Sequence, residues 1–159
     1  MDIRDIDVKT RLDLLDLPQK AMEAVIWRDA DLYASCFTVD AVWDPRPLVP
    51  HCIEGGREEI RKAFLQFYEQ LKWAAQGLYF TRIAAFDGQR ATLRSYLGEY
   101  AQAKDGSAPV GFGMYTDKCV LEDGEWRMTH HGLTPIYFGS ADYANPIFQQ
   151  LPRRGSMPF

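Results

Sequence analysis

The first part of the chain has the hydrophobic spacing of an amphipathic helix. Apolar residues recur every three to four positions, at Leu12, Leu15, Ala21, Ala24 and Val25. This period places them on one face of a helix. Pro18 interrupts the pattern, and we expect a helix to begin or kink there, with Asp16 as a candidate cap.

Two more helical segments are expected before the pattern changes. A short one covers about residues 30–37, and a longer one covers about residues 57–73 with an apolar stripe. The stripe consists of Ile60, Ala63, Phe64, Phe67 and Leu71. Between the two helices, residues 41–43 predict a short strand. Residues 44–50 hold three prolines, which fix φ and remove hydrogen-bond donors, so this segment is expected to be a loop.

After Gly77 the alternation is typical of strands. Residues 78–86 and 90–103 predict two strands, and residues 115–121 and 126–131 predict the arms of a hairpin. Asp123-Gly124 supplies the turn of that hairpin, because this dipeptide tolerates positive φ. The order of helices followed by four long antiparallel strands indicates an α+β fold, in which helices pack on one face of a curved sheet. We expect one domain over residues 1–159, with residues 138–159 as an extended C-terminal tail.

Composition narrows the range of functions. Of 159 residues, 47% are hydrophobic and 25% are charged, and the net charge is −4. Lysine and arginine do not cluster into a basic stripe. We therefore expect no nucleic-acid partner. No apolar run approaches the roughly 20 residues of a membrane span. The charged start of the chain does not resemble a secretory signal, and three widely spaced cysteines are typical of free thiols in a reducing cytoplasm. The cytoplasm is therefore the expected location.

Motifs for cofactors and metals are not found in the sequence. The chain has no GxGxxG fingerprint, no P-loop and no GxSxG elbow. Two adjacent histidines on a strand do not form the chelate that HExxH makes on a helix. We expect neither a cofactor nor a metal.

The adjacent histidines on the last predicted strand are candidates for proton transfer. Neighbouring strand residues point to opposite faces, so His130 shares a face with Trp126 and Met128, and His131 lies on the other. If Trp126 and Met128 pack inward, His130 faces the interior, whereas a β-bulge would turn His131 inward instead. Imidazole titrates near neutral pH and suits acid–base chemistry. The alternative is a structural hydrogen bond to a core hydroxyl.

Glu99 is a candidate partner for one of these histidines. By alternation it shares a strand face with Leu93, Ser95 and Leu97. If that face is internal, desolvation raises the pKa of Glu99 and makes it a competent acid or base near neutral pH. Glu99 and His130 would then form an acid–base couple across the sheet. The alternative is a carboxylate in water or paired with an arginine.

Other residues could complete a pocket. Asp31 could place a carboxylate at the cavity rim, although Asp29 and Asp31 are also expected to cap the second helix. Asp44 and His51 flank the proline-rich loop, where Asp before Pro is also ordinary turn chemistry. The aromatic candidates for substrate contact are Tyr115, Tyr33 and Trp43, each of which could equally be ordinary core.

The architecture and several motifs resemble the NTF2-like superfamily and its SnoaL-like branch. The matching segments are Met114-Tyr115-Thr116-Asp117-Lys118, Asp123-Gly124-Glu125-Trp126, Ile136-Tyr137 and the stretch 37–43. Over about residues 10–140 the chain is similar to small cofactor-free lyases of the bile acid 7α-dehydratase, scytalone dehydratase and hexachlorocyclohexane dehydrochlorinase types. The resemblance implies a cone, in which N-terminal helices fill a strongly curved antiparallel sheet around a pocket.

The resemblance also implies roles for particular positions. The acidic residue of these lyases falls close to Ile26, where Asp29 or Asp31 could substitute for it. Their histidine falls near Gly77, so the usual Asp–His dyad is not matched. A third ionisable pocket position falls at Glu99. Tyr115 matches a residue that lines the cavity, and Trp43 matches a position that is often aromatic.

The implied activity is that of a dehydratase, isomerase or cyclase acting on a small hydrophobic oxygenated molecule, such as a polyketide, steroid or terpenoid. The alternative is a non-catalytic binding or accessory protein of the same fold. Relatives assemble as homodimers or homotrimers, and aromatic residues on the outer sheet face, such as Tyr96 and Tyr100, suit such a contact.

Overall fold

The computed structural model describes residues 3–144 of the chain. A short 3-10 turn at Ile3–Asp5 precedes three α-helices and five strands. The helices are α1 (Val8–Trp27), α2 (Ala30–Ser35) and α3 (Arg57–Glu69). The strands are β1 (Phe37–Asp44), β2 (Leu71–Phe86), β3 (Arg90–Ala103), β4 (Pro109–Glu122) and β5 (Glu125–Ser140).

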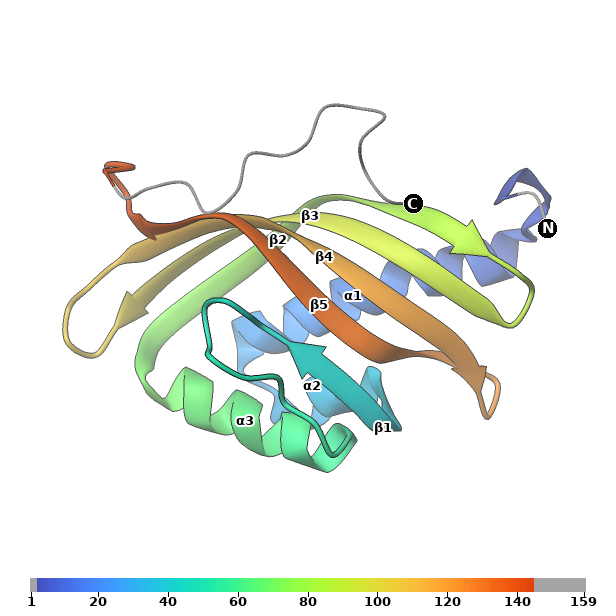
Figure 1. Ribbon diagram of the computed structural model, residues 1–159, viewed down its shortest axis with the longest axis horizontal. Helices are drawn as coiled ribbons and strands as arrows, with labels where there is room; N and C mark the ends of the chain where they lie inside the picture. The colour runs from blue at the N-terminus through green and yellow to red at the C-terminus, as the bar shows by residue number, and fades with distance from the viewer. Residues whose placement is uncertain (1–2, 145–159) are drawn as a thin grey trace.

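The strands form one curved, unclosed sheet in the order β1-β5-β4-β3-β2. Strands β2 to β5 are joined as consecutive antiparallel hairpins, as predicted, and β1 adds to the edge of β5 in parallel. The three helices lie against the concave face of the sheet (Figure 1). The predicted α+β cone of the NTF2-like type is therefore confirmed. Polar side chains on the concave face point into the space between sheet and helices, where a binding or catalytic site would lie.

Helix boundaries differ from the predictions where tertiary contacts outweigh local signals. Helix α1 runs through Pro18 without a break, and Asp7 rather than Asp16 caps it by accepting a hydrogen bond from the Thr10 backbone N–H at 2.9 Å. The side chain of Pro18 is buried, which offsets the hydrogen bond that its ring removes. Helix α3 ends at Glu69, because the segment after it pairs with the end of β3 as the start of β2.

A bulge in β5 decides which histidine faces the interior. Cys119 on β4 pairs with Met128, but the next residue back, Lys118, pairs with His130, so Thr129 is an extra residue without a partner position. A bulge of one residue reverses the faces of the residues that follow it. Met128 and His131 are therefore both buried, and His130 is only half-buried.

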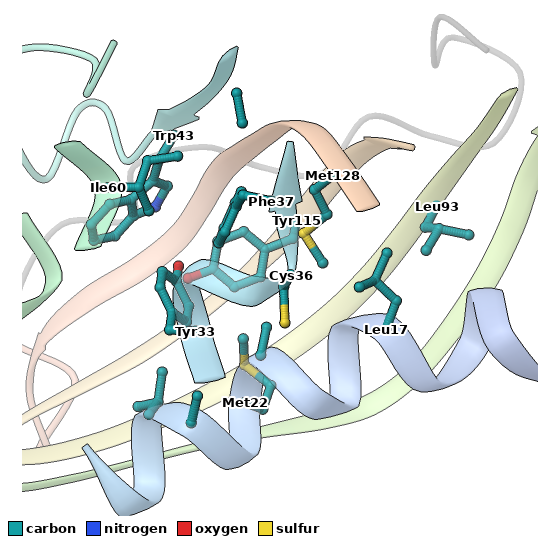
Figure 2. Packing of buried hydrophobic residues seen from close by; sticks show 14 of the residues in the cluster. Leu17, Met22, Tyr33, Cys36, Phe37, Trp43, Ile60, Leu93, Tyr115 and Met128 are labelled. Carbon is teal, nitrogen blue, oxygen red and sulfur yellow. The ribbon is translucent and has the colours of Figure 1, made fainter. Parts of the chain in front are cut away.

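The core fills the space between the sheet and the helices. Its largest fully buried members include Phe37, Phe64, Leu14, Ile60 and Met128. Figure 2 shows Trp43, Tyr33, Phe37 and Tyr115 gathered in one part of this core, with Leu17 and Leu93 packed farther along the sheet. The aromatic residues are thus concentrated where β1, β5 and α2 meet.

Two further predictions concern the end of the chain and its assembly. The tail predicted from residue 138 begins later, because β5 continues to Ser140. The remainder of that prediction lies mostly outside the described residues. On the outer face of the sheet, Tyr96 stacks on Phe80 with ring centroids 4.5 Å apart, and Tyr100 is 47% exposed. The homo-oligomer remains a prediction.

Candidate active site

A row of buried polar side chains crosses the concave face of the sheet. It consists of two pairs, Gln76 on β2 with Glu99 on β3, and Asp117 on β4 with His131 on β5. The register partner of Glu99 on β4 is Gly111, six positions before Asp117, so the two pairs lie apart along the strands. Tyr115, two residues before Asp117, is buried on the same face. Burying a polar group costs stability unless the group is paired, so this row inside an aromatic core is the candidate active site.

His131 and Asp117 form a hydrogen-bonded pair at the centre of the fold. The Nδ1 atom of His131 lies 2.6 Å from Oδ1 of Asp117, and the two side chains are 1% and 0% exposed. With Asp117 ionised, its carboxylate can only accept a hydrogen bond, and Nδ1 is then the donor. Nε2 of His131 and Oδ2 of Asp117 are also buried, and neither has a hydrogen-bond partner within residues 3–144. The pair therefore leaves one imidazole nitrogen free to act on another molecule.

Aromatic rings enclose the imidazole of His131. Tyr115 stacks on it with ring centroids 4.0 Å apart, and Phe37 and Tyr33 meet it edge-on at 5.8 and 6.5 Å. These rings exclude water, and in such surroundings the electrostatic effect of the Asp117 carboxyl on the imidazole is stronger than it would be in water.

Glu99 forms the second polar group of the row. Its Oε2 accepts a hydrogen bond of 2.6 Å from the side-chain amide of Gln76. Burial raises the pKa of Glu99, and the hydrogen bond from Gln76 only partly opposes this rise. The predicted burial of Glu99 among apolar neighbours is confirmed, and its carboxyl group retains a proton to a higher pH than an exposed glutamate does.

Tyr115 connects the two groups. Burial raises its pKa, the charge of Glu99 adds to the rise, and a hydrogen bond with Gln76 opposes it. The same tyrosine stacks on His131. A neutral tyrosine hydroxyl therefore lies close to Glu99 and Gln76, while its ring contacts the histidine.

The couple predicted between Glu99 and His130 is wrong. Because of the bulge at Thr129, His130 faces away from the interior, over Gly132, where a Cβ atom would lie 2.7 Å from the ring. Burial lowers the pKa of His130, and the nearby Lys118 lowers it further. The interior histidine is His131, as the bulge alternative required.

Three other candidates lie outside the row. Asp31 is at the surface, where its carboxylate binds Arg61 at 2.5 Å. The Arg46 guanidinium, 2.7 Å from Asp44, holds the pKa of that carboxyl well below its usual range. His51 is exposed. None of the three contributes to the interior site, whereas Tyr33, Trp43 and Tyr115 do lie in the core as wall residues.

Asp117 and Gln76 are site residues that the sequence reasoning missed. Asp117 follows Tyr115 by two positions, so strand alternation alone would have placed both on the same face. The lyase histidine position near Gly77 lies beside the inward-facing Gln76, while Gly77 itself is exposed. Ile26 is 50% exposed at the end of α1. The usual dyad positions are thus unused, and the histidine–carboxylate pair comes from β4 and β5.

The interior is closely packed around these groups. A cavity of about 10 Å³ borders Glu99, and Leu48 and Phe138 lie on its wall. A larger hollow of about 500 Å³ lies beside Asp87, and its wall includes Lys118 and Thr129 but neither Asp117 nor His131. Within residues 3–144, no cluster of three His, Cys, Asp or Glu side chains could hold a metal ion. No helix in this part of the chain is long and apolar enough to cross a membrane.

Comparison with known families identifies the chain. The SnoaL-like domain family matches residues 7–131, which is most of the chain and includes Glu99, Asp117 and His131. The chain belongs to the SnoaL-like family. A search of curated proteins gave no match.

Several solved structures share the fold at low sequence identity. A candidate aromatic ring hydroxylase from Novosphingobium aromaticivorans is 24% identical, with a TM-score of 0.79 over 89% of this chain and 100% of that one. A candidate scytalone dehydratase from the same species is 18% identical, with a TM-score of 0.75 over 91% and 96%. The type 3 hexachlorocyclohexane dehydrochlorinase from Novosphingobium barchaimii is 15% identical, with a TM-score of 0.76 over 91% and 97%. At these identities the likeness establishes the fold alone.

Removing the Asp117 carboxylate should destabilise the protein. In Asp117→Ala the Nδ1–H of His131 loses its acceptor in a dry site, which we expect to lower the free energy of unfolding by about 1–3 kcal/mol. Chemical denaturation measures this change. The control is Asp31→Ala, which removes an exposed ion pair and should alter stability little. Equal effects of the two substitutions would contradict a buried pair.

Glu99 should make stability depend on pH. Its folded-state pKa is raised above the ordinary 4.5, so the folded state holds the proton more tightly than the unfolded state does. The resulting stabilisation is complete below about pH 4.5 and is lost as the pH rises through the raised pKa. The measured quantity is the difference in unfolding free energy between the wild type and Glu99→Gln. We expect this difference to fall as the pH rises through this window. A difference that is flat or rises with pH would show that Glu99 is not desolvated.

Proposed function

We propose that the protein is an acid–base enzyme that moves a proton on a small, hydrophobic, oxygenated molecule, as dehydratases and isomerases do. One observation carries the proposal. The Nε2 atom of His131 is buried without a partner in the described part of the chain, while Nδ1 is held by Asp117 at 2.6 Å. Most buried polar atoms in folded proteins have a hydrogen-bond partner, so an unpartnered Nε2 favours a bound molecule as its partner.

His131 would act as the general base. Its free Nε2 takes a proton from a carbon next to a carbonyl group, and the Asp117 carboxylate stabilises the imidazolium that forms. Asp117 also holds the ring in the tautomer that leaves Nε2 unprotonated. The aromatic walls keep bulk water away from the reacting carbon, and the imidazolium exchanges its proton with solvent before or between turnovers.

Glu99 would act as the acid. Burial raises its pKa, so the carboxyl holds a proton to a higher pH than an exposed glutamate does and, when protonated, could give that proton to a departing oxygen. Gln76 orients the carboxyl through a 2.6 Å hydrogen bond. Because Tyr115 stands close to both Glu99 and His131, a substrate in contact with Tyr115 could reach the base on one side and the acid on the other.

The packing restricts the substrate. The side chains around His131 are aromatic, which suits an apolar ring system, and the polar row suits one or two oxygen atoms. The names dehydratase and dehydrochlorinase among the structural neighbours describe eliminations, which agrees with a base that first removes a proton. Since the cavity beside Glu99 is only about 10 Å³, a substrate has to displace side chains such as Leu48 to enter.

Proton exchange tests the proposal without knowledge of the natural substrate. An apolar ketone such as 1-indanone, incubated with the protein in D₂O, should lose its α-proton signal in the ¹H NMR spectrum faster than in buffer. His131→Gln should slow this catalysed exchange by about 100-fold or more. His130→Gln is the matched control, because His130 faces away from the interior, and it should exchange like the wild type.

Two results would overturn the mechanism. One is that a folded His131→Gln variant, checked by circular dichroism, exchanges as fast as the wild type. The other is that the wild type binds the ketone without accelerating exchange, which would favour the binding or accessory role. Asp117→Asn provides a second variant, because it keeps the shape of the site and should also slow exchange.

A further inference from the structure

The indole N–H of Trp43 is a buried hydrogen-bond donor that the proposed mechanism does not use. Trp43 is 8% exposed, and its Nε1 atom has no hydrogen-bond partner among the described residues. An indole nitrogen can only donate. Leaving such a donor unpaired in a dry core costs about 1–3 kcal/mol, a cost that a wholly apolar side chain would not carry.

Trp43 lies beside the proposed base. In the parallel pairing of β1 with β5, Trp43 is the register partner of His131. Both side chains are buried on the concave face, and the ring of Tyr33 contacts both, at centroid distances of 5.8 and 6.5 Å. Figure 2 shows Trp43 with Tyr33 and Tyr115 in the same part of the core.

The backbone fixes the position of Trp43. Its N–H and C=O exchange hydrogen bonds of 3.0 and 2.8 Å with Ile53, which closes the base of the proline-rich loop. These bonds use only main-chain atoms, so they hold the residue in place while the indole N–H stays available. The site therefore combines an unpaired donor, Trp43 Nε1–H, with an unpaired acceptor, His131 Nε2, on paired residues.

We infer that Trp43 donates a hydrogen bond to the carbonyl oxygen of the substrate and so stabilises the enolate that His131 generates. This inference rests on the proposed function of His131. A carbonyl compound with an acidic α-proton satisfies both unpaired atoms, since its oxygen accepts from Trp43 and its C–H faces Nε2. A hydrocarbon or halocarbon without oxygen would leave the indole N–H unpaired.

The chemistry then balances without a further reagent. When Nε2 takes the α-proton, the C–H electron pair forms a C=C bond and the carbonyl π electrons move to the oxygen. The indole N–H stabilises the resulting enolate, as donors placed at a developing oxyanion do. In an isomerisation the imidazolium returns the proton to a different carbon. In a dehydration the enolate re-forms the C=O bond and expels a β-hydroxyl group, which takes a proton from Glu99 and leaves as water.

A pair of matched ligands tests the inference. The probe is 2-naphthol, whose oxygen imitates an enolate, and the control is naphthalene, which has the same rings without the oxygen. In a ¹H–¹⁵N spectrum of the full chain, the Trp43 indole signal is identified by its loss in Trp43→Phe. We expect 2-naphthol to move this signal downfield and naphthalene not to do so. Trp43→Phe should weaken 2-naphthol binding about tenfold and leave naphthalene binding unchanged.

The possible failures are distinguishable. The inference is overturned if the Trp43 signal does not respond to 2-naphthol, if Trp43→Phe weakens both ligands equally, or if the wild type binds neither. The three remaining indole signals report whether the variant is folded. If instead a folded His131→Gln variant keeps its exchange activity while Trp43 still responds to 2-naphthol, the base assignment fails and the oxygen-binding role of Trp43 stands.

Discussion

The single extra residue in β5 controls the site. Without the bulge at Thr129, the alternation that buries Trp126 and Met128 would turn His130 inward and leave His131 outside. With the bulge, His131 meets Asp117 across the β4–β5 hairpin at 2.6 Å. The buried hydrogen bond in turn requires a dry aromatic enclosure, and β1, α2 and β4 supply it with Phe37, Tyr33 and Tyr115.

The sequence predicted those parts of the fold that follow from local periodicity. The strand over residues 90–103 and the Asp123-Gly124 turn could be read directly, because long alternating segments and positive-φ dipeptides act locally. The continuation of α1 through Pro18 and the early start of β2 could not, since packing and strand pairing decide them. Each error concerns a place where a distant contact outweighs the local preference.

The same distinction explains the site. The burial of Glu99 follows from unbroken alternation on β3, so the sequence predicts it. Alternation from Tyr115 also places Asp117 inside, but the role of Asp117 depends on β5 bringing His131 opposite. Whether His130 or His131 faces the interior depends on the bulge at Thr129. The sequence does not indicate this bulge, because threonine is also common in regular strands. The family resemblance gave the fold but pointed to Ile26 and Gly77, which are exposed.

The account depends on the protonation of His131, which ¹⁵N NMR of the histidine side chains measures directly. In the resting protein at neutral pH, we predict that the His131 ring carries its proton on Nδ1, where it is bonded to Asp117 and exchanges slowly with solvent. Nε2 should show the ¹⁵N chemical shift of an unprotonated ring nitrogen. His130→Gln and His131→Gln assign the signals. A proton on Nε2 with a lone pair on Nδ1 would contradict the account, because no base would then face the interior.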